Sequence, residues 1–195
     1  MVGNYRFPLD ERYSSGELLM TERPIASPQE RANRLLDSAS FLTLATFNDT
    51  MTPWASTVNY VVLRSPLRLV WYSMIQAQHS LNIERAPLVS ASIFRTDLGD
   101  ESPPAGLDGI QLLGDGRSLS DEEARDMHPL YYRLNFPDPA VRQAWELPLG
   151  EFIGQGPRRF YEIRPRCLWL LDLERWRADK VDQRLAVDID SLNAS

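Results

Sequence analysis

The chain has 195 residues, enough for one domain with or without an extended arm, and its 43% hydrophobic and 25% charged residues are typical of globular proteins. Its net charge of −6 argues against nonspecific binding to nucleic acid or to an anionic membrane surface. The single cysteine excludes an internal disulfide, and neither a signal peptide nor an apolar run of roughly 20 residues is found, so we expect a cytoplasmic protein.

Residues 1–26 show no sustained periodicity and are expected to form an arm that precedes a single domain over residues 27–195. The segment Ser27–Glu30 combines a serine, a proline and a glutamate in the order of a capping box, and predicts a helix that ends near Ser38. Branched and aromatic residues separated by turn residues then predict strands over Phe41–Phe47, Trp54–Leu63 and Leu67–Ser73.

A helix is expected from Gln76 to Arg85, between the strand ending at Ser73 and a further strand over Val89–Phe94. The first turn of a helix has free backbone N–H groups and the positive end of the helix dipole, which together favour an anion. Four side chains of this junction can add donors there: Ser73, Gln76, Gln78 and His79. An ordinary strand-to-helix crossover with solvated polar residues is the alternative, and spacing alone favours it.

The second half of the chain begins with a predicted loop over residues 96–107 and alternates between strands and helices. Strands are predicted over Ile110–Leu119, with a bulge or bend at Gly114 and Gly116, over Arg158–Arg164 and Cys167–Leu173, separated by a turn at Pro165, and weakly over Val181–Ile189. Helices are predicted from a second capping box at Ser120–Glu123 towards Leu134, and around Val141–Trp145. Six or seven antiparallel strands with inserted helices favour a small, mostly β barrel with α decoration (α+β) over a doubly wound parallel sheet.

Several familiar kinds of site are not indicated. The chain has no glycine-rich dinucleotide fingerprint and no phosphate-binding loop that ends in Gly-Lys-Ser/Thr. His79 and His128 are far apart and have no second histidine at ligand spacing, so no metal site is expected. Cys167 lies in an apolar run and is interpreted as a buried small residue, and Tyr131-Tyr132 with Phe136 as a packing face.

Residues Ser73–Phe94 resemble the flavin-binding split-barrel family whose namesake is pyridoxamine 5′-phosphate oxidase. The resemblance is carried by Ser73, the pair Gln78-His79, Asn82, and Pro87 followed by the strand VSASIF. Three more stretches agree with the family in the same order: Ala45–Val62, Gly109–Gly114, and Arg159–Pro165 ahead of Trp169. Together these stretches extend the resemblance from about Ala32 to Leu192.

The resemblance implies a six-stranded antiparallel split β-barrel that forms a homodimer and binds FMN in a groove between the subunits. By position, Trp54, Ala55 and Ser56 run along the isoalloxazine edge. Ser73, Gln78 and His79 receive the phosphate, Gln111 reaches the flavin ring, and Asn82 braces the helix. No catalytic residue is implied.

Two departures from the family pattern limit the activity that can be transferred. The oxidase proper carries an Arg-Lys pair where this chain has Gln78-His79, and its Arg-Leu-His-type run is absent from Arg175–Lys180. Vitamin B6 oxidation is therefore not expected.

The expected function is an FMN-dependent oxidoreductase that acts on a small molecule, with no nucleic-acid or membrane partner. The alternatives are a non-catalytic flavin-binding module and a haem-binding or haem-degrading protein in which His128 serves as axial ligand. A deazaflavin in place of FMN is a further alternative.

Overall fold

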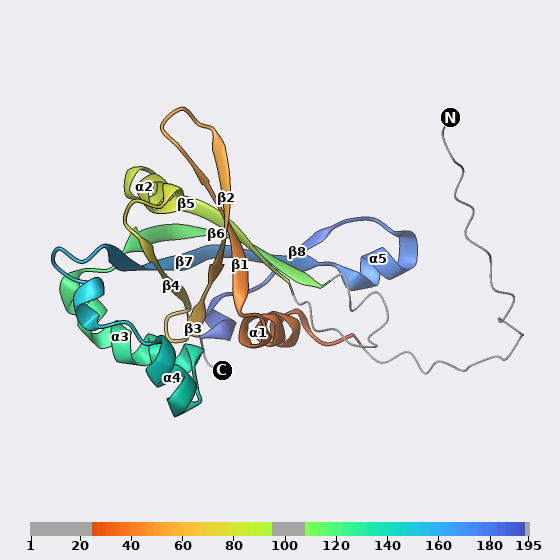
Figure 1. Cartoon of the computed structure of the whole chain (residues 1–195). Helices are drawn as coiled ribbons and strands as arrows, with labels where there is room; N and C mark the ends of the chain where they lie inside the picture. The colour runs from red at the N-terminus through yellow and green to blue at the C-terminus, as the bar shows by residue number, and fades with distance from the viewer. Residues whose placement is uncertain (1–24, 95–107, 194–195) are drawn as a thin grey trace, which may run out of the picture.

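One eight-stranded antiparallel sheet, curled into a half-barrel, organises the chain (Figure 1). The computed structural model describes residues 25–94 and 108–193. The strands are β1 (Phe41–Phe47), β2 (Pro53–Asn59), β3 (Val61–Leu63), β4 (Arg68–Met74), β5 (Leu88–Phe94), β6 (Gly109–Ser118), β7 (Arg158–Leu171) and β8 (Arg184–Ala186). Their order in the sheet is β2-β1-β5-β6-β7-β4-β3, and β8 pairs with β7.

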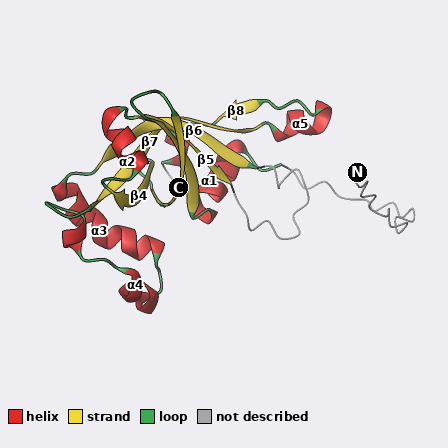
Figure 2. Ribbon diagram, turned by 45° about the horizontal axis from the view of Figure 1, so that its top comes forward, coloured by secondary structure: helices red, strands yellow, loops and turns green. Residues whose placement is uncertain are grey.

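Five α-helices and two short 3₁₀ helices surround the sheet in the described ranges. They are α1 (Pro28–Ser38), α2 (Gln78–Arg85), α3 (Asp121–Asn135), α4 (Pro139–Trp145), α5 (Leu173–Asp179), η2 (Leu149–Glu151) and η3 (Asp190–Leu192). Figure 2 shows α3 and α4 together at one end of the molecule, and α5 with β8 at the other. No helix in these ranges is long and apolar enough to cross a membrane. The predicted loop over 96–107 and all but the last two residues of the predicted arm lie outside the described residues.

Both predicted capping boxes are confirmed. At the start of α1, the Ser27 hydroxyl accepts from the Glu30 amide at 3.2 Å, and the Glu30 carboxylate accepts from the Ser27 amide at 2.8 Å. Ser120 and Glu123 repeat this arrangement at the start of α3. Each box satisfies backbone donors that a helix start leaves free, so these two starts are fixed by local sequence.

Two apolar cores lie on opposite faces of the sheet. The first fills the concave side, with Trp71 of β4, Ile110 of β6 and Leu168 of β7 among its members, and α1 adds Leu35 and Leu36. The second lies between β3, β4, β7 and α3, and contains Val70 together with Tyr131, Tyr132, Phe152 and Phe160. The packing role predicted for Tyr131 and Tyr132 is thus confirmed.

The predicted strand Trp54–Leu63 is broken at Tyr60 into β2 and β3. The Tyr60 amide donates to the Ser40 carbonyl at 3.1 Å, after which the chain leaves β1 and pairs with β4 instead. Both segments are apolar and extended, so periodicity alone does not show that the strand changes partners.

The predicted turn at Pro165 is also wrong, because β7 runs without interruption through it. Pro165 lies opposite Gly114, beside the register shift between Leu113 and Gly114 in β6. A strand tolerates the missing N–H of proline at such a bulge. An irregularity is present next to Gly114, as predicted, but its extra residue is Arg166 of β7 and not a residue of β6. Helix α5 was not predicted, and α2 begins two residues later than expected.

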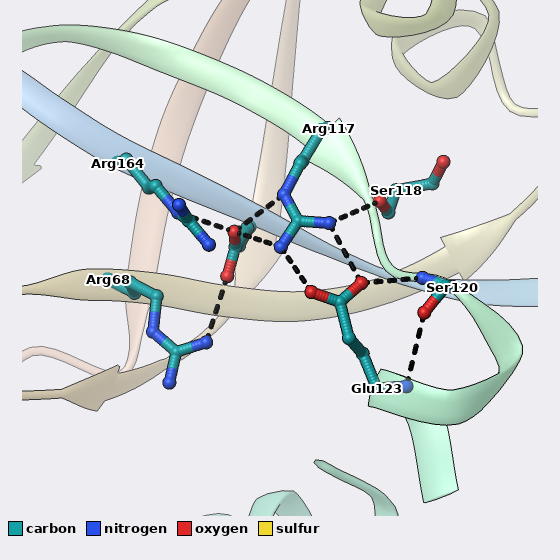
Figure 3. A network of polar contacts seen from close by, with 7 residues as sticks. Arg68, Arg117, Ser118, Ser120, Glu123 and Arg164 are labelled. Atoms are coloured by element: carbon teal, nitrogen blue, oxygen red, sulfur yellow. Dashed lines mark hydrogen bonds and ion pairs between the residues drawn. The ribbon is translucent and has the colours of Figure 1, made fainter. Parts of the chain in front are cut away.

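A charged network centres on Glu162 of β7, whose residue is fully buried. Figure 3 shows three arginines around its carboxylate: Arg117 Nε and Arg164 Nε each donate at 2.8 Å, and Arg68 Nη1 donates at 3.2 Å. Arg117 also forms two bonds, of 2.6 and 2.8 Å, with Glu123 of α3. These hydrogen bonds from Arg117 are the main reason why the pKa of Glu123 is lowered to about 2. The network therefore ties α3 to β4, β6 and β7.

Candidate functional site

Polar side chains gather where β4 ends and α2 begins, a region called here the β4–α2 corner and made of residues 73–82. Ser73 Oγ lies 2.7 Å from His79 Nε2, across the turn that joins the two elements. Gln78 Nε2 donates to Asn82 Oδ1 at 2.8 Å along the helix. The structure therefore brings together the four side chains that the resemblance assigned to this end of the cofactor.

Asn82 connects the corner to the neighbouring strands. Its amide donates to Thr46 Oγ1 of β1 at 2.9 Å, and both residues are buried. Thr46 is the cross-strand partner of Trp54 in β2, and its hydroxyl lies 3.5 Å from the Trp54 carbonyl oxygen. A polar chain thus runs from Gln78 through Asn82 and Thr46 to Trp54, and fixes α2 against β1 and β2.

The start of α2 lacks a side-chain cap. Its N-cap residue is Ala77, which forms no side-chain hydrogen bond, whereas the other four α-helices in the described ranges are capped by Ser27, Ser120, Asp138 and Asp172. The first-turn N–H groups of α2 therefore have no side-chain acceptor among these described residues. Together with the helix dipole they favour a negatively charged group.

His79 is nine-tenths buried, and burial lowers its pKa because charge is disfavoured away from water. The ring is therefore neutral near pH 7, with one nitrogen as donor and the other as acceptor. No carboxylate of the described residues pairs with His79. Ser73 and His79 therefore lack the third member of a catalytic triad, the carboxylate that orients the histidine.

Trp54 and Ser56 lie at the same end of the sheet as the corner. Their cross-strand partners are Thr46 and Leu44, so their side chains point to the concave face. Trp54 Nε1 donates to Ser56 Oγ at 3.0 Å, and the indole remains 48% exposed. An exposed aromatic ring and two polar groups therefore border the corner on the β2 side.

Ala55 and Gln111 lie on the other, convex face. Ala55 is the partner of Ala45, and Gln111 is exposed between Ser92 and Trp169, with its neighbours along β6 buried in the first core. Six of the eight predicted cofactor residues are therefore gathered around the corner, and these two are separated from them by the thickness of the sheet.

Large apolar side chains flank the small residues on that convex face. Thr43 and Ala45 of β1 pair with Ser92 and Ser90 of β5, and the ends of these strands carry Phe41, Phe47, Leu88 and Phe94, which are 57%, 45%, 49% and 58% exposed. Exposed apolar groups of this size are typical of surfaces that bind another protein.

His128 lies away from the corner, on α3 within the second core. Its ring contacts Tyr132, Phe152 and Phe160, and its Nε2 lies 2.7 Å from the Leu147 carbonyl oxygen. Because a carbonyl only accepts, this nitrogen carries the proton and donates.

Two residues near the corner were missed by sequence reasoning, namely Thr46 and Arg159. Thr46 follows Leu42 and Leu44 at an inward-facing position of β1, and a polar residue at such a position needs a partner. That signal was present in the sequence. Arg159 is placed beside Ser73 only by the pairing of β4 with β7, which the sequence does not reveal.

No known family model matches the sequence, and no curated protein matches it either. Solved structures do match the fold. A protein related to general stress protein 26 of B. subtilis, of the pyridoxinephosphate oxidase family, from Clostridium acetobutylicum is 10% identical with a TM-score of 0.56, over 84% of this chain and 96% of that one. The chain has the split-barrel fold of pyridoxamine 5′-phosphate oxidase-like proteins. The fold implied by the resemblance is confirmed, although the sheet has eight strands rather than six.

Two further structures share the split barrel. A heme binding protein from Mycobacterium smegmatis is 19% identical with a TM-score of 0.61, and the match covers 88% of this chain. The chain spans only 62% of the length of that protein. An FAD-binding protein from Mesorhizobium loti is 16% identical with a TM-score of 0.53, over 73% of this chain and 92% of that one.

Proposed function

We propose that this split barrel is an FMN-dependent oxidoreductase that holds the phosphate of the cofactor at the β4–α2 corner. The observation that carries the proposal is the uncapped start of α2 beside the partly buried pairs Ser73–His79 and Gln78–Asn82. Backbone N–H groups, a hydroxyl and an amide converge there without a side-chain acceptor for the helix start, which is the donor set that a phosphate needs.

The flavin ring extends from the corner along β2. The exposed indole of Trp54 offers a flat apolar surface, and Ser56 and the backbone of Ala55 offer polar groups to the ring edge. The bonds from Asn82 to Thr46 and from Gln78 to Asn82 hold the phosphate end and the ring end of this site in a fixed relation.

The chain forms a homodimer through the convex face of β1 and β5. Burying Phe41, Phe47, Leu88 and Phe94 against a second copy removes four large exposed side chains from water. Gln111 lies on the same convex face. In the proposed dimer it therefore contacts the cofactor that is bound at the site of the second copy.

Bound FMN supplies hydride and electron transfer, and the protein supplies binding, orientation and exclusion of water. Trp54 orients the ring, and the β4–α2 corner holds the phosphate. No side chain at the corner is assigned as a general acid or base.

Two observations favour FMN over haem, which the name of the Mycobacterium smegmatis structure raises as the second candidate. His128 is enclosed by aromatic rings and donates to Leu147, and His79 is bonded to Ser73. Neither imidazole presents a free Nε2 to an iron atom. A module that binds flavin without catalysis differs from the proposal only in the reduction step.

The experiment compares FMN binding and FMN reduction in the purified protein. We expect the protein to quench FMN fluorescence on titration, to elute as a dimer by light scattering, and to lose the visible flavin band when NADH or NADPH is added without oxygen. Binding without reduction supports the non-catalytic module, and a Soret band on addition of haem with no FMN binding overturns the proposal.

The variant Gln78→Glu places a carboxylate in the first turn of α2, which suits the helix but repels a phosphate. We expect FMN affinity to fall by at least about tenfold, since hydrogen bonds to charged groups contribute roughly 1.5–3 kcal/mol. The matched control Gln143→Glu, at an exposed position of α4, should bind FMN like the wild type. Equal binding by both variants contradicts the placement of the phosphate.

A further inference from the structure

The proposed phosphate ligands at the β4–α2 corner carry no net charge. Ser73 and Gln78 are neutral, and His79 is neutral near pH 7 because burial lowers its pKa. A phosphate monoester has a charge of about −1.5 to −2 at that pH. Bringing such a charge into a partly buried site without a cation is unfavourable, so the charge must come from a residue outside this set.

The pairing of β4 with β7 places Arg159 next to the corner. Arg159 is the cross-strand partner of Ser73, and residues directly opposite on antiparallel strands point to the same face with Cβ atoms about 5 Å apart. The Ile75 amide also donates to the Pro157 carbonyl at 3.0 Å, which joins the turn before α2 to the start of β7.

The Arg159 charge lies near Tyr161 of β7 and Glu84 of α2. Tyr161 lies two residues further along β7 and points to the same face. Burial raises the pKa of Tyr161, the carboxylate of Glu84 acts in the same direction, and the charge of Arg159 opposes both.

The Arg159 side chain is half-buried, and within the described ranges its guanidinium is held by backbone carbonyls only. Nη1 donates to Arg158 O at 2.6 Å and to Gly156 O at 2.8 Å, and Nη2 donates to Gly154 O at 2.6 Å. Among residues 25–94 and 108–193 no carboxylate pairs with it, whereas the adjacent Arg158 pairs with Glu151. Contacts within these ranges use three of its five N–H donors, which leaves two donors and the full charge for a ligand.

The loop that holds this guanidinium is itself fixed. A Cβ at Gly156 would lie 2.3 Å from the Gly150 carbonyl oxygen, so only glycine fits there. Gly154 has a φ of +56° and its amide donates to Asp121 of α3 at 3.0 Å. Arg159 is therefore held in place before any ligand binds, which reduces the entropy lost on binding.

We propose that Arg159 supplies the positive charge that binds the phosphate at the β4–α2 corner, and so makes this site select phosphorylated flavin over riboflavin. The inference rests on the proposed function, and it assigns the discrimination to a residue of β7 rather than to the α2 side chains.

The test compares Arg159→Gln with the matched control Arg158→Gln, using fluorescence quenching to measure the dissociation constants of FMN and riboflavin. We expect Arg159→Gln to weaken FMN binding by about 10- to 100-fold, the range expected for a bond to a charged group, and to leave riboflavin binding within about twofold. Arg158→Gln should leave both within about twofold. An unchanged FMN-to-riboflavin ratio in Arg159→Gln overturns the inference.

Inorganic phosphate provides a readout that does not depend on the flavin. We expect phosphate to raise the melting temperature of the wild type and of Arg158→Gln, but not of Arg159→Gln. If the wild type binds no flavin but shows this pattern, the proposed function fails and the anion site stands. Equal stabilisation of all three proteins overturns the role of Arg159, and no stabilisation of the wild type overturns the anion site. If Arg159→Gln does not fold, Arg159→Lys serves instead, and must retain part of the FMN preference because it keeps the charge but loses the planar fork.

Discussion

Removing the charge of Glu162 provides a direct test of what stabilises the β7 side of the sheet. In the variant Glu162→Gln, a neutral amide of nearly the same shape replaces a carboxylate that is fully buried and bonded to Arg68, Arg117 and Arg164. The three guanidinium groups then lose their shared counter-ion, and one amide oxygen cannot replace two charged ones.

The expected loss follows from the exposure of the three partners. Breaking a buried ion pair from one side typically costs about 3–5 kcal/mol. The side chains of Arg68 and Arg164 are 24% and 52% exposed and can turn towards water, and Arg117 keeps its bond to Glu123. The loss is therefore expected near the lower limit, at about 3 kcal/mol, which corresponds to a fall of about 6–12 °C in melting temperature for a domain of this size.

Urea unfolding followed by tryptophan fluorescence measures this loss as a change in midpoint at constant slope. The control Glu123→Gln removes a carboxylate that is 40% exposed and shares the same arginine, so its loss should be nearer 1 kcal/mol. A loss below about 1 kcal/mol in Glu162→Gln contradicts the view that the buried carboxylate dominates the network. So does a loss in Glu123→Gln that exceeds the loss in Glu162→Gln.

Three other measurements test the β4–α2 corner and the β6–β7 pairing. Burial lowers the pKa of His79 in the folded protein, so the unfolded chain binds more protons at mildly acidic pH. The free energy of unfolding should therefore fall as the pH drops below about 6.5, and level off below the folded pKa. In His79→Gln, the urea midpoint should depend less on pH over this range. Thr46→Val leaves the buried Asn82 amide without its acceptor and should lower the free energy of unfolding by about 1–3 kcal/mol, whereas Thr57→Val, at an exposed position of β2, should change it by less than about 0.5 kcal/mol. Gly114→Ala puts a Cβ 2.5 Å from the Arg164 carbonyl oxygen, and should destabilise the protein by at least about 1 kcal/mol in thermal unfolding. In the control Gly150→Ala the new Cβ meets nothing within 4 Å, so the stability should hardly change.

Local signals in the sequence were sufficient for the elements whose ends are set by local contacts. The bounds of β1 and the start of α1 agree with the sequence prediction because turn residues and a capping box act over a few positions. The break at Tyr60 and the uninterrupted course of β7 depend on which strands pair, and that information is not local. Pairing is also what places Pro165 at a bulge rather than at a turn.

The same distinction applies to the candidate site. Ser73, Gln78, His79 and Asn82 lie within ten residues, so a short motif is enough to identify them as a group. Arg159 reaches the corner through a pairing between residues far apart in the chain, and no short motif includes it. The faces of Ala55 and Gln111 follow from the alternation along β2 and β6 once the concave side is known, and that side is defined only by the folded sheet.

Strand β4 has a consequence for local opening of the protein. Trp71 packs in one core and Val70 in the other, so this strand is covered on both sides, and β3 and β7 pair with its two edges. Backbone amides in such a strand exchange with solvent only through the largest unfolding events. Ser73 lies at the end of this slowly exchanging segment, so the proposed anion-binding corner persists through fluctuations that open the periphery of the protein.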